Sequence, residues 1–340
     1  MNVILLHSMQ GTSTRHAHMT RQPGKYPDPR PLRPRAYCRQ THPFRTGLLW
    51  LLLLAPILTA SNVAARSALK VVAVENTWGD LAAQIAEPDM AVTSLLASPV
   101  VDPHLYAPSP DDARHLADAT LVVVNGAGYD TWASKLTDAA GLPAERIIRA
   151  DSWPGWHMGD NPHLWFNTRA VADFVTRMQA ACAQADPAHA SAYAQRAHTL
   201  LDAIAHVNAL LASMRTHVAG RAVAATEPLF DPLAEQMGLD MKEKDFQTAI
   251  MNGVEPAPAD IAQFENDLTT HKLHLLAYNQ QMIEPAVVPL LELADSSGTP
   301  SLPLTEALPP TLPGTTRPPH WQDWVSFIAR QTEHLLEHQP

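Results

Sequence analysis

The fold is decided by residues 168–217, which read TRAVADFVTRMQAACAQADPAHASAYAQRAHTLLDAIAHVNALLASMRTH. This stretch is dominated by Ala, Leu and Gln and contains no strand pattern, so we expect it to be helical. Its one interruption is Asp186-Pro187, where Pro187 can open a second helix with Asp186 as its cap. That helix would run to about His217, and about 30 residues at 1.5 Å each span roughly 45 Å. Such a helix is longer than one small lobe, which indicates that it links two lobes.

Strands alternate with helices on both sides of that segment. Short apolar runs precede it at 71–74, 92–96, 121–124 and 147–148, and others follow it at 222–225, 273–278 and 301–304. Helical patterns lie between and after them at 78–86, 130–140, 229–237, 258–270, 287–297 and 320–338. A further helix starts at Ser109-Pro110-Asp111-Asp112, with Ser as cap, Pro at the first helical position and acids in the first turn. We therefore expect an α/β fold of two lobes, each a mostly parallel sheet flanked by helices, joined by a long linking helix.

The first 66 residues differ in composition from the rest and are expected to be a leader. They hold nine of the 24 basic residues of the chain and one of its 34 acids, Asp28. An apolar run, GLLWLLLLAPILTA at 47–60, follows Arg45 and leads to the small residues of Val63-Ala64-Ala65. A positive flank, a short apolar core and a small-residue exit are typical of a secretory signal peptide, and the alternative is an uncleaved membrane anchor.

The remaining chain divides into three parts and is expected to be periplasmic. We assign 1–66 to the basic leader and signal peptide, 67–167 to an N-terminal α/β lobe, 168–219 to a helical segment with the linking helix, and 220–340 to a C-terminal α/β lobe. Cys38 lies in the leader, which leaves Cys182 alone in the body, where it is expected to be a small buried side chain. The body carries 15 basic and 33 acidic residues, a formal charge of about −18 that disfavours nucleic acid as a partner and attracts cations.

Two similar motifs present histidines from stiff loops. The first is Asp102-Pro103-His104-Leu105-Tyr106 and the second is Asn161-Pro162-His163-Leu164-Trp165. The preceding Pro restricts the backbone, so each His is held by a loop rather than by a helix face. Two imidazoles held in this way are good ligands for a divalent transition metal, which makes His104 and His163 candidate metal ligands.

Two carboxylates occupy matching positions in the second lobe. Glu227 ends the strand AVAAT, and Glu306 follows the strand SLPL. In open α/β sheets, ligands bind beyond the carboxyl ends of the strands. Two imidazoles from one lobe and two carboxylates from the other would make a closed four-residue metal site. Three residues that follow a second-lobe strand are expected to line the site and to orient its ligands, namely Tyr278, Asn279 and Gln281. Asn125 is expected to hold a backbone turn near the site.

The chain resembles the metal-binding receptors of ABC importers for zinc and manganese, the cluster A-I solute-binding proteins, over nearly all of residues 69–338. The resemblance rests on the two Pro-His motifs, on Val124-Asn125-Gly126 with Gly128, and on the passages around Glu227 and Glu306. It implies two lobes bridged by a long rigid helix, with the metal between them. It also maps the first two family ligands onto His104 and His163.

The other two ligand positions depart from parts of the family pattern. The third ligand, His or Glu in the family, falls on Glu227, as in manganese-type members. The fourth, usually Asp, falls on Glu306, which has a longer reach. The long His-rich loop of some zinc receptors is absent, because 152–160 is short and holds only His157. His157 is expected to be a flexible surface residue, and the pair His334 and His338 near the end of the chain is expected to bind no metal.

The ligand types leave the metal open between manganese and zinc. Imidazole suits zinc and carboxylate suits manganese, so bidentate carboxylates would favour manganese and monodentate ones a tetrahedral zinc site. The resemblance implies a monomeric periplasmic receptor that captures the divalent metal as a transported ligand. The receptor would deliver it to a membrane permease powered by a cytoplasmic ATPase.

Two other functions are compatible with a metal site of this kind. One is a secreted metallohydrolase, which would need a coordination position open for water and a nearby acid or base. Four protein ligands would fill this site, and the chain has no His-Glu-x-x-His motif, so we expect the protein not to be an enzyme. The other alternative is a surface adhesin, as some members of the family are called.

Overall fold

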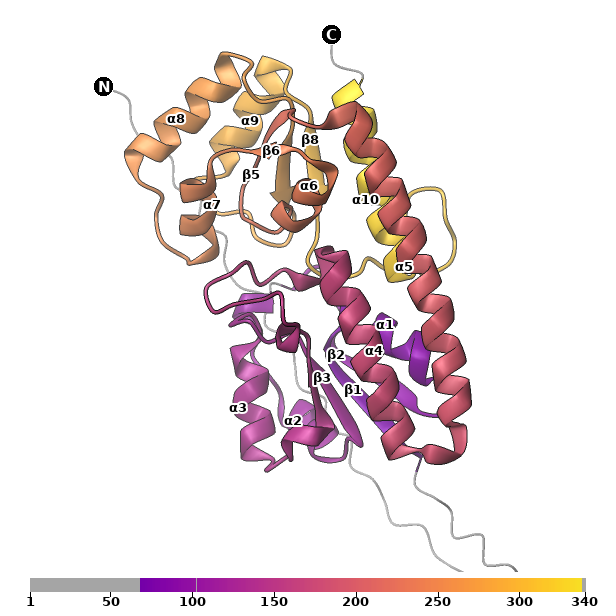
Figure 1. Cartoon of the computed structure of the whole chain (residues 1–340). Coiled ribbons are helices and arrows are strands. Elements are labelled where there is room, and N and C mark those ends of the chain that lie inside the picture. Colours follow the sequence, from indigo (N-terminus) through magenta and orange to yellow (C-terminus); the bar gives the residue numbers. More distant parts are fainter. Residues whose placement is uncertain (1–67, 102, 338–340) are drawn as a thin grey trace, which may run out of the picture. The chain divides into compact units, whose positions relative to one another are not determined.

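The computed structural model describes residues 68–101 and 103–337 (Figure 1). The leader and signal peptide expected at 1–66, Cys38, Asp102 and His338 therefore lie outside the described residues. Within the described part, no helix has the length and apolar character needed to cross a membrane.

The first lobe is built on a four-stranded parallel sheet with the strand order β2-β1-β3-β4. Its strands are β1 (Lys70–Glu75), β2 (Ala91–Leu96), β3 (Leu121–Val124) and β4 (Ile147–Arg149), and its helices are α1 (Asn76–Ala86), α2 (Pro110–Ala117) and α3 (Thr131–Ala139). All four residues of β3 are buried, as expected for an inner strand of a parallel sheet covered on both faces. The Ser109 side chain accepts a hydrogen bond from the backbone N–H of Asp112, which confirms the helix start at Pro110.

The second lobe repeats this arrangement. Its parallel sheet has the order β6-β5-β7-β8, so in both lobes the first strand lies between the second and the third. The strands are β5 (Ala222–Ala225), β6 (Asp240–Met241), β7 (Leu276–Asn279) and β8 (Ser301–Leu304), and the helices are α6 (Asp231–Met237), α7 (Lys244–Met251), α8 (Pro258–Thr269) and α9 (Val288–Ser297). The expected α/β fold is confirmed, whereas β6 and α7 were not expected.

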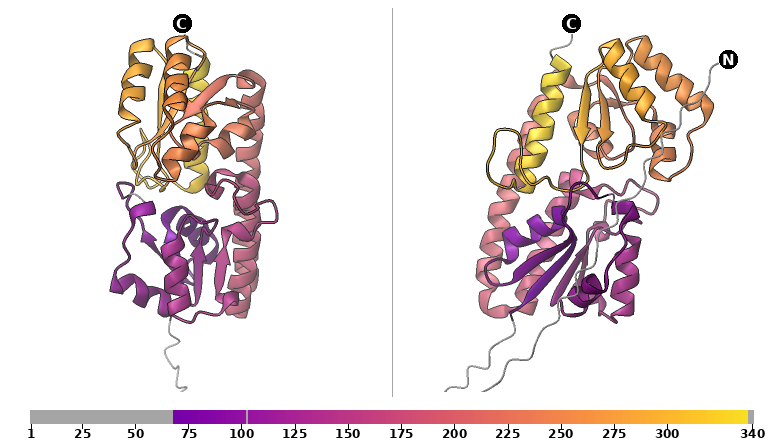
Figure 2. Two further views of the ribbon diagram at one scale, coloured as in Figure 1. Left: turned by 90° about the vertical axis from the view of Figure 1, so that its left-hand side faces the viewer. Right: turned by 180° about the vertical axis from the view of Figure 1, so that it is seen from behind.

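A helix of 29 residues, α5 (Ala190–Val218), packs against elements of both lobes. It contacts α1 and α4 (Thr168–Ala185) towards the first lobe and α6 towards the second (Figures 1 and 2). Pro187 opens a short 3-10 turn, so the α-helix begins three residues later than expected, at Ala190. The Asp186 carboxylate accepts a hydrogen bond from the hydroxyl of Tyr193 at 3.1 Å instead of capping the backbone.

The last helix, α10 (Trp321–Glu337), lies beside α5 (Figure 1). It starts against α1 of the first lobe, where the backbone N–H of Trp321 donates to Asp80 Oδ2 at 2.7 Å and His320 Nδ1 lies 2.7 Å from Asp80 Oδ1. One contiguous apolar core includes buried residues of both sheets, of α5 and of α10. Cys182 belongs to that core and is fully buried, as expected.

Candidate metal centre

His104 is presented by the loop that follows β2. It lies in the short 3-10 turn Pro103–Leu105, in which Pro103 is buried and anchors the turn. The His104 side chain is 24% exposed, and its Nε2 lies 3.7 Å from Oε1 of Glu306 in the second lobe. The first Pro-His motif therefore directs its imidazole towards a second-lobe carboxylate.

His163 is fully buried at the start of the 3-10 turn Leu164–Phe166. Its backbone N–H donates to Asn161 Oδ1 at 2.9 Å, and its ring Nδ1 lies 2.8 Å from the same oxygen. Because the Asn161 amide nitrogen donates to Pro228 O, Asn161 Oδ1 acts as the acceptor and Nδ1 of His163 carries the proton. Nε2 then has its lone pair available, and it lies 3.8 Å from Glu306 Oε1.

The two carboxylates follow β5 and β8 and are both buried. The side-chain amide of Asn279, at the end of β7, donates to Glu306 Oε1 at 2.9 Å and also to Glu227 Oε1. The hydroxyl of Tyr129 donates to the other Glu306 oxygen, Oε2, at 2.5 Å. The structure thus brings His104, His163 and Glu306 together directly, and it joins Glu227 to them through Asn279.

The protonation states around Glu306 suit metal binding. Burial by itself would raise the pKa of Glu306, but the neighbouring His104 and His163 outweigh it and hold that pKa below its usual value. Burial lowers the pKa of His163 and keeps its ring neutral. Burial and the charge of Glu306 raise the pKa of Tyr129 well above its usual value, so its hydroxyl stays protonated and donates. An ionised carboxylate beside a neutral imidazole is the state in which both groups bind a cation.

The donor set fits a divalent transition metal. Among the residues that the structure describes, the buried Nε2 of His163 has no hydrogen-bond partner. A buried polar atom of this kind is costly unless a partner is supplied. Two ligand atoms each about 2.1 Å from one metal lie about 3.0–3.4 Å apart, so separations of 3.7 and 3.8 Å between the imidazoles and Glu306 require only a small contraction.

Three further residues hold the site in place. Asn125, expected to support it, donates to Pro162 O at 3.0 Å and accepts from the indole of Trp78, which fixes the loop that carries His163. Gln281, also expected, accepts from the backbone N–H of Glu306 at 2.6 Å and donates to Val101 O in the loop before His104. Asn279 bridges both carboxylates, whereas the structure records no hydrogen bond from Tyr278 to the site.

Sequence reasoning missed two residues that connect the lobes at the site. Tyr129 contacts Glu306, which is 177 positions away along the chain. Asn76 donates to Leu308 O at 2.7 Å and accepts from Leu308 N at 2.9 Å, and so fastens the loop after Glu306 to the start of α1. The only local signal for Tyr129 is the turn Asn125-Gly126-Ala127-Gly128 before it.

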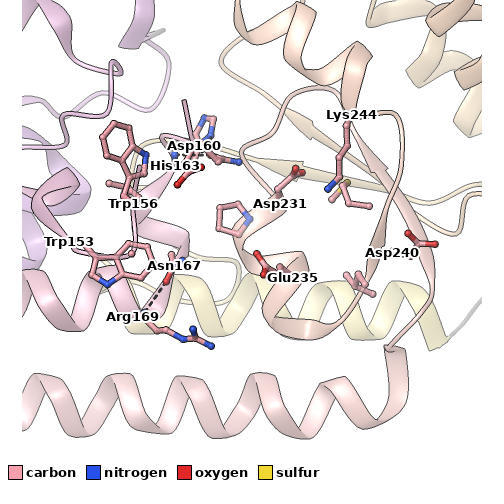
Figure 3. Close-up of a pocket in the computed structure, with 16 residues that line it drawn as sticks. Trp153, Trp156, Asp160, His163, Asn167, Arg169, Asp231, Glu235, Asp240 and Lys244 are labelled. Atoms are coloured by element: carbon pink, nitrogen blue, oxygen red, sulfur yellow. Dashed lines mark hydrogen bonds between the residues drawn. The ribbon is translucent and has the colours of Figure 1, made fainter. Parts of the chain in front are cut away.

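A cavity of about 570 Å³ adjoins the site (Figure 3). Of the four candidate ligands only His163 lines it, together with Trp153, Trp156, Asp160 and Asp231 among others. His157 lies outside the site, as expected, and its Nδ1 is 3.3 Å from Asp160 in an exposed pair. The cavity is therefore a neighbour of the four-residue cluster and not the place where its ligands meet.

The family model of the periplasmic zinc-uptake complex component A, ZnuA, matches residues 71–337. The chain belongs to the ZnuA family. This is a family of extracytoplasmic solute-binding proteins rather than enzymes, as expected from the sequence. Membership also confirms the resemblance to the cluster A-I receptors.

Similar proteins carry names that refer to different metals. This ZnuA-family chain is 27% identical over 177 residues to the iron-binding protein YfeA of Yersinia pestis, covering 50% of this chain and 57% of YfeA. It is 25% identical over 178 residues to the manganese-binding lipoprotein MntA of Halalkalibacterium halodurans, covering 51% and 59%. The chain thus spans a little over half the length of these two relatives.

The fold is shared with solved structures of the family. The periplasmic zinc binding protein TroA from Treponema pallidum superposes with a TM-score of 0.65 at 17% sequence identity, covering 79% of this chain and 98% of TroA. At this identity the likeness shows the two-lobed fold with its linking helix.

Proposed function

We propose that this ZnuA-family chain is the metal-binding receptor of an ABC importer and that His104, His163, Glu227 and Glu306 are its metal ligands. The observation that carries the proposal is the convergence of the buried, unpartnered Nε2 of His163 with an ionised Glu306 from the other lobe. A carboxylate and an imidazole brought together from distant parts of the chain suit capture and release of a cation. The cargo is a divalent transition metal, manganese or zinc.

The ligand set can bind either metal, and the number of carboxylate oxygens that bind decides which of the two is favoured. Asn279 donates to one oxygen of Glu306 and Tyr129 donates to the other. While both donors stay in place, each Glu306 oxygen has one lone pair in a hydrogen bond, so we expect Glu306 to bind the metal through one oxygen, which favours the four-coordinate geometry of zinc. If the Asn279 amide moves away, Glu227 is released, and if Tyr129 moves away as well, both oxygens of Glu306 are released; binding through two oxygens favours manganese.

Release requires the contacts between the lobes at the site to part. Tyr129 and Val101 belong to the first lobe, and they are tied to Glu306 and Gln281 of the second. Separating these pairs would remove Glu306 from the two imidazoles and leave the cation with first-lobe ligands alone. We propose that docking on the membrane permease, whose ATPase supplies the energy, favours this separation. We also propose that the receptor is a periplasmic monomer divided at about residues 167 and 219.

The ligand assignment is tested by titrating metal-free protein, purified without a histidine tag, with Mn²⁺ and with Zn²⁺. We expect one tight binding event, with a Kd below micromolar for at least one metal. His104→Ala and Glu306→Gln should each raise that Kd at least a hundredfold, because each removes a ligand.

His157→Ala is the matched control, since it removes a nearby exposed histidine and should leave the Kd unchanged. Binding no tighter than micromolar would overturn the receptor proposal. A tight site that survives His104→Ala would overturn the ligand assignment while leaving the receptor proposal standing.

A further inference from the structure

Three metal-binding side chains meet on the surface where α5 and α10 lie side by side. His217 lies in the last turn of α5, and Glu333 and Glu337 lie one turn apart on α10. Nδ1 of His217 is 2.9 Å from Glu333 Oε1 and 3.8 Å from Glu337 Oε1. One ligand atom from each residue lies within 4.8 Å of the other two. We call these three residues the α5–α10 cluster.

The cluster gathers negative charge at one point. Glu333 and Glu337 are four residues apart on one helix face, a spacing at which two like charges destabilise a helix. The carboxylate of Glu333, by its hydrogen bond to the ring, raises the pKa of His217. The two carboxylates thus favour a positive charge between them, which a proton on His217 or a metal cation can supply.

The geometry is that of a partial coordination shell. Two ligand atoms about 2.1 Å from one cation lie about 3.0–3.4 Å apart, and the separations of 2.9 and 3.8 Å fall on either side of that range. One imidazole and two carboxylates are a donor set used by zinc and manganese, and the exposed side of the cluster leaves room for water to complete the shell. We propose that the α5–α10 cluster is a second divalent-metal site, separate from the site between the lobes, that binds Zn²⁺ or Mn²⁺ with His217, Glu333 and Glu337 as ligands.

Binding there would fasten the C-terminal helix to the linking helix. His217 comes from α5 and the carboxylates from α10, so the cation would cross-link two helices that are joined in sequence only through the whole second lobe. His217 is 54% exposed, so water competes with the protein ligands, and we expect a weaker site than one with four buried ligands.

The chain contains a matched comparison on the same helix. His198 Nδ1 lies 3.0 Å from Asp202 Oδ2 in an exposed i, i+4 pair on α5. That pair supplies one carboxylate where the α5–α10 cluster supplies two. If His217 were only half of a surface ion pair, the two histidines would behave alike when metal is added.

The test is a calorimetric titration of the metal-free chain with Zn²⁺ up to 1 mM, without a histidine tag. We expect a second binding event with a Kd in the micromolar range, beyond any tight event. His217→Ala should abolish the second event, and Glu333→Gln combined with Glu337→Gln should raise its Kd at least tenfold. His198→Ala should leave it unchanged, and His104→Ala should weaken only the tight event.

The outcomes separate this site from the interlobe site. If the titration of wild-type protein shows the weaker binding event but no tight one, the receptor proposal is overturned and the α5–α10 site is not. No second event in wild-type protein, or a second event that persists in His217→Ala, would overturn the α5–α10 site. Circular dichroism of each variant confirms folding, which we expect to be unchanged because the substituted side chains are exposed or half-buried.

Discussion

Replacing Tyr129 with Phe is the sharpest test of how the site is held. The hydroxyl of Tyr129 is buried and donates to Glu306 Oε2 at 2.5 Å across the two lobes. Tyr129→Phe keeps the ring, which packs edge-on against Trp165 with centroids 5.0 Å apart, and removes only the donor. Glu306, whose side chain is fully buried, then loses a charge-assisted hydrogen bond.

The magnitude follows from burial and charge. A hydrogen bond to a charged group contributes about 1.5–3 kcal/mol, so urea unfolding of the metal-free protein should show a loss in that range. Partners that orient a metal ligand typically contribute about 10- to 100-fold in affinity. We therefore expect the Kd for the preferred metal, measured by calorimetry, to rise by at least about tenfold in Tyr129→Phe.

The matched control is Tyr193→Phe. Tyr193 is also buried, and its hydroxyl also donates to a carboxylate, that of Asp186, but at the start of the linking helix. We expect this variant to lose stability while it keeps the wild-type Kd. A Tyr129→Phe protein that binds metal within twofold of wild type would refute the proposed role of the hydroxyl in orienting Glu306.

Three other substitutions test separate features. Asn279→Ala removes the donor shared by Glu227 and Glu306, so that the two buried carboxylates repel each other. The free energy of unfolding of the metal-free protein, measured in urea, should fall by about 2–3 kcal/mol. An unchanged unfolding midpoint would contradict this. Burial raises the pKa of Asp231 to about 6, so the folded state binds its proton more tightly than the unfolded state and this group makes wild-type stability fall as pH rises from about 4 to 6. Asp231→Asn should remove up to about 2–3 kcal/mol of that fall, whereas parallel pH profiles of the two proteins would count against a buried charge. Ser109→Ala removes the cap of α2 and should cost about 1 kcal/mol in thermal or urea unfolding, while no measurable loss would mean that the capping box contributes nothing.

The sequence predicts the elements whose patterns are local. Leu121–Val124 is a run of four apolar residues, and the strand β3 has the same bounds. A short apolar run is enough to predict a buried parallel strand. Helix α7 was not predicted, because its N-cap residue Glu243 has a positive φ of 58° and makes no capping hydrogen bond. The sequence therefore carries no signal for the start of this helix. Strand β6 has only the two residues Asp240 and Met241, too few to show an alternation.

The candidate ligands of the site can be predicted from the sequence, but the residues that contact them across the lobes cannot. Pro-His motifs and strand-end acids mark His104, His163, Glu227 and Glu306 because stiff loops and sheet edges present side chains in ways that sequence records. Whether they all bind metal stays a prediction. Tyr129 could not be found in this way, because its role depends on contact with a residue 177 positions away and no local pattern encodes that contact.

The contact of Asp80 with the start of α10 bears on the order in which the chain can fold. Asp80 lies on α1, the first helix of the described chain. Its largely buried carboxylate accepts a hydrogen bond from Gln84 on the same helix and also contacts Trp321 and His320 at the start of α10. Trp321 also donates its indole N–H to Trp165 O within the first lobe. The first lobe therefore lacks these partners of Asp80 and of Trp165 O until residues 320 and 321 have been synthesised. A chain on a ribosome that stalls before residue 320 would therefore have a first lobe without these hydrogen bonds.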